Sequence, residues 1–163
     1  MESVKLDNID KQIIEILQQE GRIANNELAK RIGLTTTPTL ERVRRLEREG
    51  VVEGYSAHIN KEKVGKGFTA FVTVTLSVHQ LNLLEEFTAA IQEIPEILSC
   101  YNTTGEGDFL LQVVAKDTKD YEQILRMKLA TLPDVMRVHT SIVLSTIKEQ
   151  SIIPVKDHDR DKE

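Results

Sequence analysis

The sequence predicts an α+β protein with an N-terminal unit of three helices and a C-terminal unit of alternating strands and helices. Apolar residues recur at helical spacing over the first fifty residues, whereas residues 68–78 alternate with period two, as in a half-buried strand. Between the two patterns lies a polar stretch that contains Gly65 and Gly67, which we interpret as part of a hinge. A length of 163 residues suits one or two domains.

Two helices are expected before residue 34. The first begins at the N-cap Asp7 and ends near Gly21, which can adopt the left-handed conformation that stops a helix. The second is shorter, is capped by Asn25 or Asn26, and ends at Gly33. A short turn leads from it directly into a third helix. Two helices joined by a short turn that contains Gly form a helix-turn-helix, here winged-helix-like and expected over residues 1–54.

The third helix, expected from the N-cap Thr35 to about Gly50, is amphipathic. At about 100° per residue, Leu40, Val43 and Leu46 fall on one side, which we expect to lie in the core. The other side carries hydroxyls near the N-terminus and arginines further along. A helix that reads the major groove of DNA uses short polar groups for base edges and Arg for guanine or phosphate. The predicted DNA-binding residues are therefore Thr35, Thr36, Thr37, Pro38, Glu41, Arg42, Arg44, Arg45 and Arg48.

Taken alone, this helix is better explained as a solvated face with Glu–Arg pairs at helical spacing. The helix-turn-helix context reverses that preference. The net charge of −5, from 21 basic and 26 acidic residues, does not predict nucleic-acid binding. Only the clustering of the arginines in the third helix does.

The second unit is predicted as a βαββαβ ferredoxin-like sandwich over residues 68–148. Residues 51–59 look like a strand that leaves the first unit, and residues 55–67 form the strand and hinge linker. One layer of helices leaves the other face of the sheet uncovered, so we expect a dimer through the sheets. The polar tail, residues 149–163, is expected to fray. The elements expected in the sandwich are strands over 68–78, 97–104, 109–115 and 135–147 and helices over 81–94 and 118–132.

No constellation of residues in the sequence suggests catalysis or metal binding. Cys100 is the only cysteine, which excludes an internal disulfide and a cysteine-based zinc site. The four histidines have no partner at metal-binding spacing, and no serine stands in a nucleophile-elbow context. We therefore expect no enzyme and no cofactor. The N-terminus lacks a basic-then-apolar signal and no apolar run could span a membrane, so we expect a cytoplasmic protein without a membrane partner.

Several motifs follow one another in a specific order. They are Leu6-Asp7-x-x-Asp10, Gly21-Arg22-Ile23, Glu27-Leu28-Ala29, Gly33-Leu34-Thr35, Glu41-Arg42-Val43-Arg44-Arg45-Leu46-Glu47-x-x-Gly50, Gly54-Tyr55, Thr104-Gly105-x-x-Asp108-Phe109 and Leu132-Pro133-x-Val135. In their order and spacing the chain resembles the Lrp/AsnC (feast/famine, leucine-responsive) family of transcription regulators, from about Leu6 to Ile147.

This resemblance implies a sequence-specific DNA-binding transcription regulator that is modulated by a small amino acid effector. It implies homodimers that assemble to octamers around which double-stranded DNA can wrap. It also implies effector clefts between dimers, formed in part by the turn from Gly105 to Asp108. Backbone groups of that turn can hold a carboxylate and Asp108 can accept from an ammonium, although Asp108 could equally serve only to stabilise the hairpin. The predicted effector-binding residues are Thr104, Gly105, Glu106, Gly107, Asp108, Met136 and Thr140.

Two other functions fit the same elements. One is an architectural DNA-binding protein that does not respond to a ligand. The other is a small-molecule-binding regulatory subunit whose helix-turn-helix docks onto protein, and the arginine-rich third helix argues against it.

Overall fold

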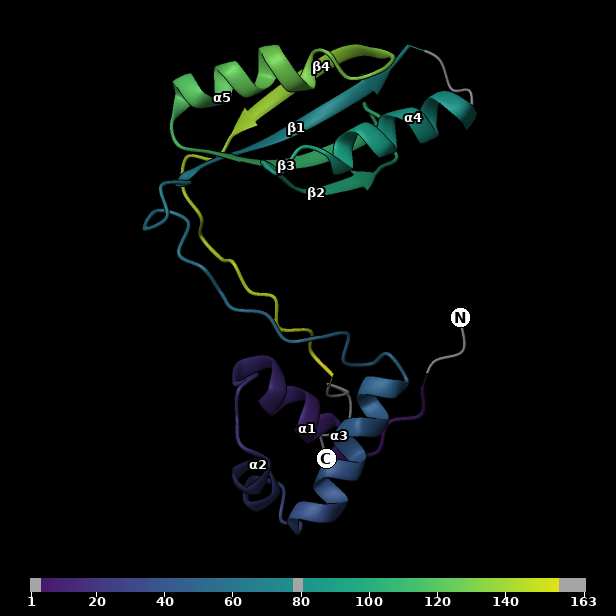
Figure 1. The fold of residues 1–163 in the computed structure, drawn as a ribbon, viewed down its shortest axis with the longest axis vertical. Coiled ribbons are helices and arrows are strands. Elements are labelled where there is room, and N and C mark those ends of the chain that lie inside the picture. The colour runs from purple at the N-terminus through teal and green to yellow at the C-terminus, as the bar shows by residue number, and fades with distance from the viewer. Residues whose placement is uncertain (1–3, 78–80, 156–163) are drawn as a thin grey trace, which may run out of the picture. The chain divides into compact units, whose positions relative to one another are not determined.

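A computed structural model describes residues 4–77 and 81–155 of the chain. It divides into two compact units, drawn in Figure 1. The first unit contains the described residues up to His58 together with those from Lys148 on, and the second runs from Ile59 to Ile147. Residues 148–155 therefore belong to the same unit as residues 4–58.

Three helices form the first unit: α1 (Asn8–Gln19), α2 (Asn25–Arg31) and α3 (Thr36–Arg48). A capping box starts α1, because the Asp7 carboxylate accepts from the Asp10 N–H at 2.8 Å and the Asp10 carboxylate accepts from the Asp7 N–H at 3.0 Å. The N-cap of α2 is Ala24 rather than an asparagine. The buried residues of the helical core are Ile13, Ile14, Leu28, Ile32 and Leu46.

The tail was expected to fray from residue 149, but its described part, residues 149–155, pairs with α1. The rest of the tail, residues 156–163, lies outside the described residues. The side-chain amide of Gln18 donates to the Ile153 carbonyl at 3.0 Å and accepts from the Ile153 N–H at 2.6 Å. Val155 packs against the helical core. A glutamine amide offers one donor and one acceptor side by side, so it can hold an extended backbone as a neighbouring strand would.

The strand expected over residues 51–59 does not form, although all of these residues are described. The Val51 and Val52 N–H groups instead donate to the Leu46 carbonyl at 2.9 and 3.1 Å, and both side chains pack on the helical core. Their amides thus satisfy a carbonyl at the end of α3, which would otherwise lack an intrahelical partner.

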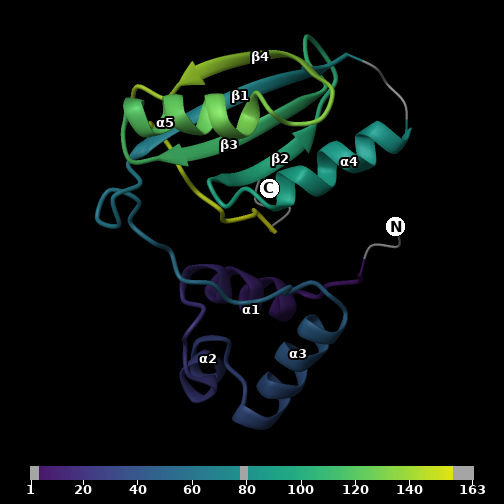
Figure 2. The same cartoon turned by 45° about the horizontal axis from the view of Figure 1, so that its top comes forward.

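The second unit is the expected βαββαβ sandwich. Its four strands form an antiparallel sheet in the order β2-β3-β1-β4, with α4 and α5 on one face (Figure 2). A π-helical segment, η1, continues α5. The elements are β1 (Phe68–Leu76), α4 (Leu81–Gln92), β2 (Ile97–Asn102), β3 (Phe109–Ala115), α5 (Thr118–Ile124), η1 (Leu125–Leu129) and β4 (Val135–Ile142).

Alternation along β1 separates the two faces of the sheet. Val72 and Val74 are buried beneath the helices, whereas Phe71, Thr73 and Thr75 point to the open face. Strand β4 ends at residue 142 rather than 147, and its last residue, Ile142, pairs with Ala70 of β1. The Val143 N–H still donates to the Thr69 carbonyl at 3.0 Å, close to the start of β1 at Phe68. Residue 78, the expected end of β1, lies outside the described residues.

Candidate nucleic-acid interface and ligand pocket

The exposed face of α3 carries most of the residues predicted to read DNA. Thr35 stands at the N-cap, and its side chain makes no capping hydrogen bond. Pro38, in the first turn, is half-buried. The predicted residues that lie exposed to solvent are Thr35, Thr36, Thr37, Glu41, Arg44 and Arg48. Hydroxyls and two guanidiniums are therefore presented along one side of the helix, as direct readout requires.

Arg42 and Arg45 do not belong to this face, because both turn back to α1 and pair with Asp10. The Asp10 carboxylate is only 1% exposed and accepts from Arg42 Nη1 at 2.8 Å and from Arg45 Nη2 at 2.5 Å. Arg42 Nη1 also donates to Asp7 at 2.7 Å. A buried carboxylate is stable only when it is paired. The structure therefore uses these two arginines to join α3 to α1.

The surroundings of this cluster shift the ionisation of its outer members. The Asp10 N–H bond to Asp7, followed by the Arg42 side-chain bond, lowers the pKa of Asp7 below its ordinary value. The bonds from Arg42 to Asp7 and Asp10 raise the pKa of the guanidinium. Both shifts favour the charged forms that make the ion pairs.

The inward face of α3 also differs from the prediction at one position. Leu46 is fully buried and Val43 packs on the helical core, as expected. Leu40, expected in the core, is 37% exposed. Its neighbour Thr39 is 0% exposed, and the Thr39 hydroxyl donates to the Thr35 carbonyl at 2.8 Å. Helix α3 therefore turns Thr39 inward and Leu40 outward.

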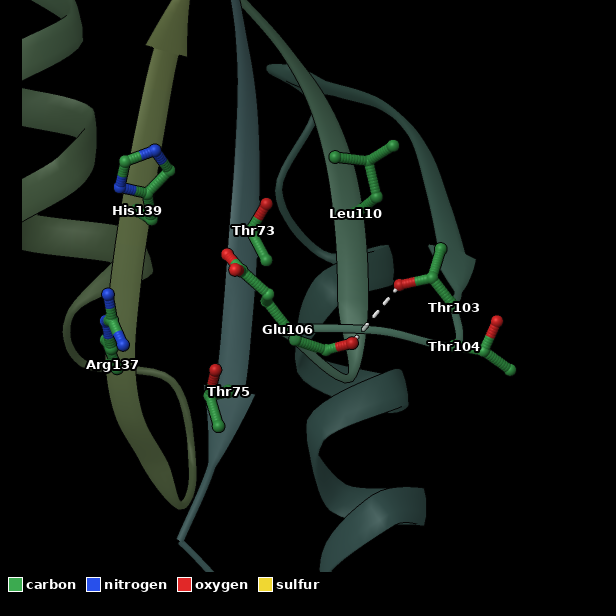
Figure 3. Close-up of a pocket in the computed structure, with 9 residues that line it drawn as sticks. Thr73, Thr75, Thr103, Thr104, Glu106, Leu110, Arg137 and His139 are labelled. Carbon is green, nitrogen blue, oxygen red and sulfur yellow. Dashed lines mark hydrogen bonds between the residues drawn. The ribbon is translucent and has the colours of Figure 1, made fainter.

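A pocket of about 590 Å³ opens on the uncovered face of the sheet, at the end where the β2–β3 turn meets β1 and β4 (Figure 3). Three strands and the turn supply its walls. The lining residues are Thr73, Thr75, Thr103, Thr104, Glu106, Gly107, Leu110, Arg137 and His139. Three of them, Thr104, Glu106 and Gly107, were predicted from the sequence.

Charges of both signs line this pocket. Arg137 and His139 project from β4, and the Glu106 side chain reaches over β1 from the turn (Figure 3). Within the described part of the chain, neither Glu106 nor Arg137 makes an ion pair. A pocket with a guanidinium and a carboxylate can bind a zwitterion, because each charged end of the ligand meets its opposite.

Asp108 does not line the pocket but fastens the turn to β1. Its carboxylate accepts from the Leu76 N–H at 2.8 Å, and its own N–H donates to the Val74 carbonyl at 2.9 Å. Gly107 crosses β1 so closely that a Cβ there would lie 2.2 Å from the Thr73 Cγ2 atom. Gly105 has φ of 129°, which favours glycine. These contacts explain the Gly-x-x-Asp pattern as backbone geometry.

Met136 and Thr140 also lie away from the pocket. The Thr140 hydroxyl is 2.6 Å from the Tyr121 hydroxyl of α5, on the helix-covered face. The residues of β4 that do line the pocket, Arg137 and His139, pair with Thr75 and Thr73 in the β1–β4 register. Neighbouring residues of a strand point to opposite faces of the sheet. The alternation along β4 could therefore have identified Arg137 and His139 only if the β1–β4 register had been known.

The described residues also bear on metal binding and on membrane insertion. In the described ranges, no three His, Cys, Asp or Glu side chains gather as metal ligands do. Nor does any described helix have the length and hydrophobicity needed to cross a membrane. Two of the four histidines, at positions 79 and 158, lie outside the described residues.

Family models match both parts of the chain. The Lrp/AsnC ligand binding domain matches residues 69–153, and a winged helix-turn-helix DNA-binding model matches residues 6–53. The leucine-responsive regulatory protein of Salmonella typhimurium is 40% identical over 151 residues, which cover 93% of this chain and 92% of that protein. The protein of the same name from Escherichia coli is 39% identical over the same coverage.

Solved structures with the same fold are also similar in sequence. A transcriptional regulator from Neisseria meningitidis, solved as a complex with L-Met, has a TM-score of 0.89 and 35% identity over 92% of this chain and 97% of that one. An AsnC family transcriptional regulator from Agrobacterium tumefaciens has a TM-score of 0.87 and 30% identity over 91% and 97% of the two chains.

Proposed function

The chain belongs to the Lrp/AsnC family of DNA-binding transcription regulators, and from that premise we propose that a small amino acid, bound in the pocket at the end of the sheet, controls its binding to DNA. The observation that carries this proposal is that Glu106 and Arg137, of opposite charge, lie on the walls of one pocket and make no ion pair with any described residue. The regulator solved with L-Met supports an amino acid as the class of ligand.

We assign the ligand's two charged groups to different sides of the pocket. Arg137 binds the α-carboxylate, since a guanidinium presents paired donors to a carboxylate. Glu106 accepts from the α-ammonium. The hydroxyls of Thr73, Thr75 and Thr104 supply further polar contacts, and Leu110 contacts the ligand's side chain. Asp108 acts through the turn, which it holds over β1.

We assign DNA contact to the exposed face of α3. Its hydroxyls at the N-terminal end and Glu41 meet base edges, and Arg44 and Arg48 meet guanine or phosphate. Regulation then needs no catalytic residue, and the protein is not an enzyme. The DNA-binding helix-turn-helix and the bacterial relatives support a cytoplasmic location.

We further propose that two copies pair through the open faces of their sheets. On that face Phe71 is 38% exposed and Tyr101 is 58% exposed. Exposed apolar side chains that gather on one face indicate an interaction site. A second copy on this face would wall in the pocket, so ligand binding and assembly, up to an octamer, would be linked in both directions. Light scattering that gave a monomeric mass at micromolar concentration would contradict the pairing.

The effector proposal is tested by thermal unfolding of the full chain with each of the twenty amino acids. A ligand that binds only the folded state raises the melting temperature. The Arg137→Gln and Glu106→Gln variants should lose this increase, whereas Arg126→Gln, an exposed arginine of η1 that does not line the pocket, should keep it. If no amino acid changes the melting temperature of the wild type, an architectural role without a ligand is the better description.

A further inference from the structure

Two adjacent residues of α3 occupy positions opposite to those that packing alone would favour. Thr39 is fully buried, whereas Leu40 is 37% exposed. Val43 and Leu46, further along the same helix, pack in the helical core. The helix therefore buries a hydroxyl completely and leaves more than a third of the larger apolar residue exposed to solvent.

Stability does not explain this order. A buried leucine would remove more apolar surface from water than a buried threonine, and a threonine outside would satisfy its hydroxyl with water. The hydroxyl of Thr39 instead has to be satisfied by the Thr35 carbonyl within the helix. Positions that break the packing rule without a gain in stability are expected where a surface has another task.

The neighbours of Leu40 indicate what that task is. Thr36 lies one turn before it and Arg44 one turn after it, and both are exposed. Leu40 is thus an apolar position between a hydroxyl and a guanidinium, near the N-terminal end of the helix. In the major groove, the apolar group that a base presents is the 5-methyl group of thymine.

We propose that Leu40 contacts the methyl group of a thymine and so determines one position of the DNA sequence that the protein binds. The inference rests on the proposed contact between the exposed face of α3 and DNA. It adds a base preference to that contact: thymine at the position facing Leu40, flanked by positions that face Thr36 and Arg44.

The first experiment selects binding sites from random double-stranded DNA with full-length wild-type, Leu40→Ala and Gln12→Ala proteins. Gln12 is exposed on α1 and serves as the control. The wild type and Gln12→Ala should select the same motif. Leu40→Ala should select that motif with one thymine relaxed and the other positions kept. Its melting temperature should stay close to that of the wild type, because Leu40 does not belong to the core.

The second experiment replaces each thymine of the selected site in turn by deoxyuridine, which pairs identically but lacks the methyl group. Loss of one buried methyl contact should lower wild-type affinity by about fourfold at the thymine that Leu40 faces. The Leu40→Ala protein should bind the thymine and deoxyuridine sites equally well there.

Three results would overturn the proposal. The first is selection of the unchanged motif by Leu40→Ala. The second is a lower melting temperature of Leu40→Ala with no change in base preference, which would make Leu40 a core residue. The third is an equal loss of affinity by the wild type and by Leu40→Ala at every deoxyuridine. If the wild type selected no sequence at all, the failure would lie with the proposed DNA contact of α3.

Discussion

The DNA-binding unit and the ligand-binding unit use charged side chains in the same two ways. In the first unit, Arg42 and Arg45 are taken up by the buried Asp10, whereas Arg44 points to solvent. In the second, Asp108 is taken up by the Leu76 N–H, whereas Glu106 faces the pocket. In each unit, one charged residue stabilises the fold. A second charged residue, one or two positions away in the sequence, is available to bind a partner.

The difference between the two units lies in how the structural charge is neutralised. Asp10 is met by two guanidiniums that come from another helix, so its pairing joins α1 to α3. Asp108 is met by a backbone N–H of a neighbouring strand, so its bond fixes the path of a turn. Burial separates an ion pair from water and increases the cost of losing one partner, so Asp10 should be the more sensitive position.

The largest effect is expected at Asp10. Asp10→Ala would remove the shared partner of Arg42 and Arg45, whose side chains are 28% and 34% exposed, and one side of the α1 capping box; it should cost about 3–5 kcal/mol. Urea unfolding followed by helical circular dichroism measures this loss. Glu41→Ala, on the exposed face of α3, should stay close to the wild type. Equal stability of both variants would show that the buried cluster contributes nothing.

Substitutions at Arg45 and Arg44 should have different effects, the first on stability and the second on DNA affinity. Arg45→Ala removes a charge-assisted bond to Asp10 and should cost about 1.5–3 kcal/mol of unfolding free energy. Arg44→Ala should leave stability unchanged, weaken DNA binding and lower the slope of affinity against salt by about one. Unfolding curves and fluorescence anisotropy at several salt concentrations decide between them. If Arg45→Ala instead weakened DNA binding and left stability unchanged, Arg45 would belong to the DNA-binding face.

The same separation is expected in the ligand-binding unit. Asp108→Ala leaves the Leu76 N–H without its acceptor and should cost about 1–3 kcal/mol even without ligand. Glu106→Gln should unfold like the wild type and lose the thermal response to the effector. A normal melting temperature of Asp108→Ala combined with a lost response would instead make Asp108 a ligand contact.

Two glycines of the turn can be compared by a single methyl group. Gly107→Ala would place a Cβ 2.2 Å from Thr73 Cγ2 and 3.2 Å from the Val74 carbonyl oxygen, so the turn must move, at about 1–3 kcal/mol. Gly105→Ala meets no atom within 4 Å and pays only for its φ of 129°, about 1 kcal/mol. Differential scanning calorimetry should therefore give a lower melting temperature for Gly107→Ala than for Gly105→Ala.

The smallest effect is expected from acid. The Asp10 N–H and Arg42 lower the pKa of Asp7, and the Lys128 side chain lowers the pKa of Glu96 in the second unit. Each carboxylate thus stabilises the folded state above its unfolded pKa, about 3.9 for Asp and about 4.3 for Glu, and loses that contribution as the pH falls through its folded pKa. Unfolding free energies should fall less steeply below about pH 5 in Asp7→Asn and Glu96→Gln.

Periodicity predicted both units from the sequence, because a helical stripe and a period-two strand are local patterns. The Asp7 cap, the Thr35 start and the bounds of β3 followed from the same local chemistry. The pairing of Asp10 with Arg42 could not be foreseen, since the two residues are 32 positions apart and the helix wheel assigned the arginines to solvent. Local sequence patterns do not reveal contacts between residues that are far apart in the sequence.

The errors inside the sites have equally specific causes. Hydrophobicity favoured Leu40 over Thr39 for the core, and only the packed helices show that the threonine faces inward. In β4, Thr140 and His139 are equally plausible strand residues, and the β1–β4 register decides which face each one takes. Local pattern predicts an element well but leaves its rotation or its register open.

The return of the chain at Lys148 has a consequence for biosynthesis. Because the first unit contains residues on both sides of the second, the ligand-binding unit is an insertion within the DNA-binding unit. Gln18 is translated 135 residues before Ile153, its hydrogen-bonding partner. The DNA-binding unit of the nascent protein is therefore incomplete until the ligand-binding unit has been synthesised. A protein truncated before Lys148 would have a DNA-binding unit that lacks the segment paired with Gln18.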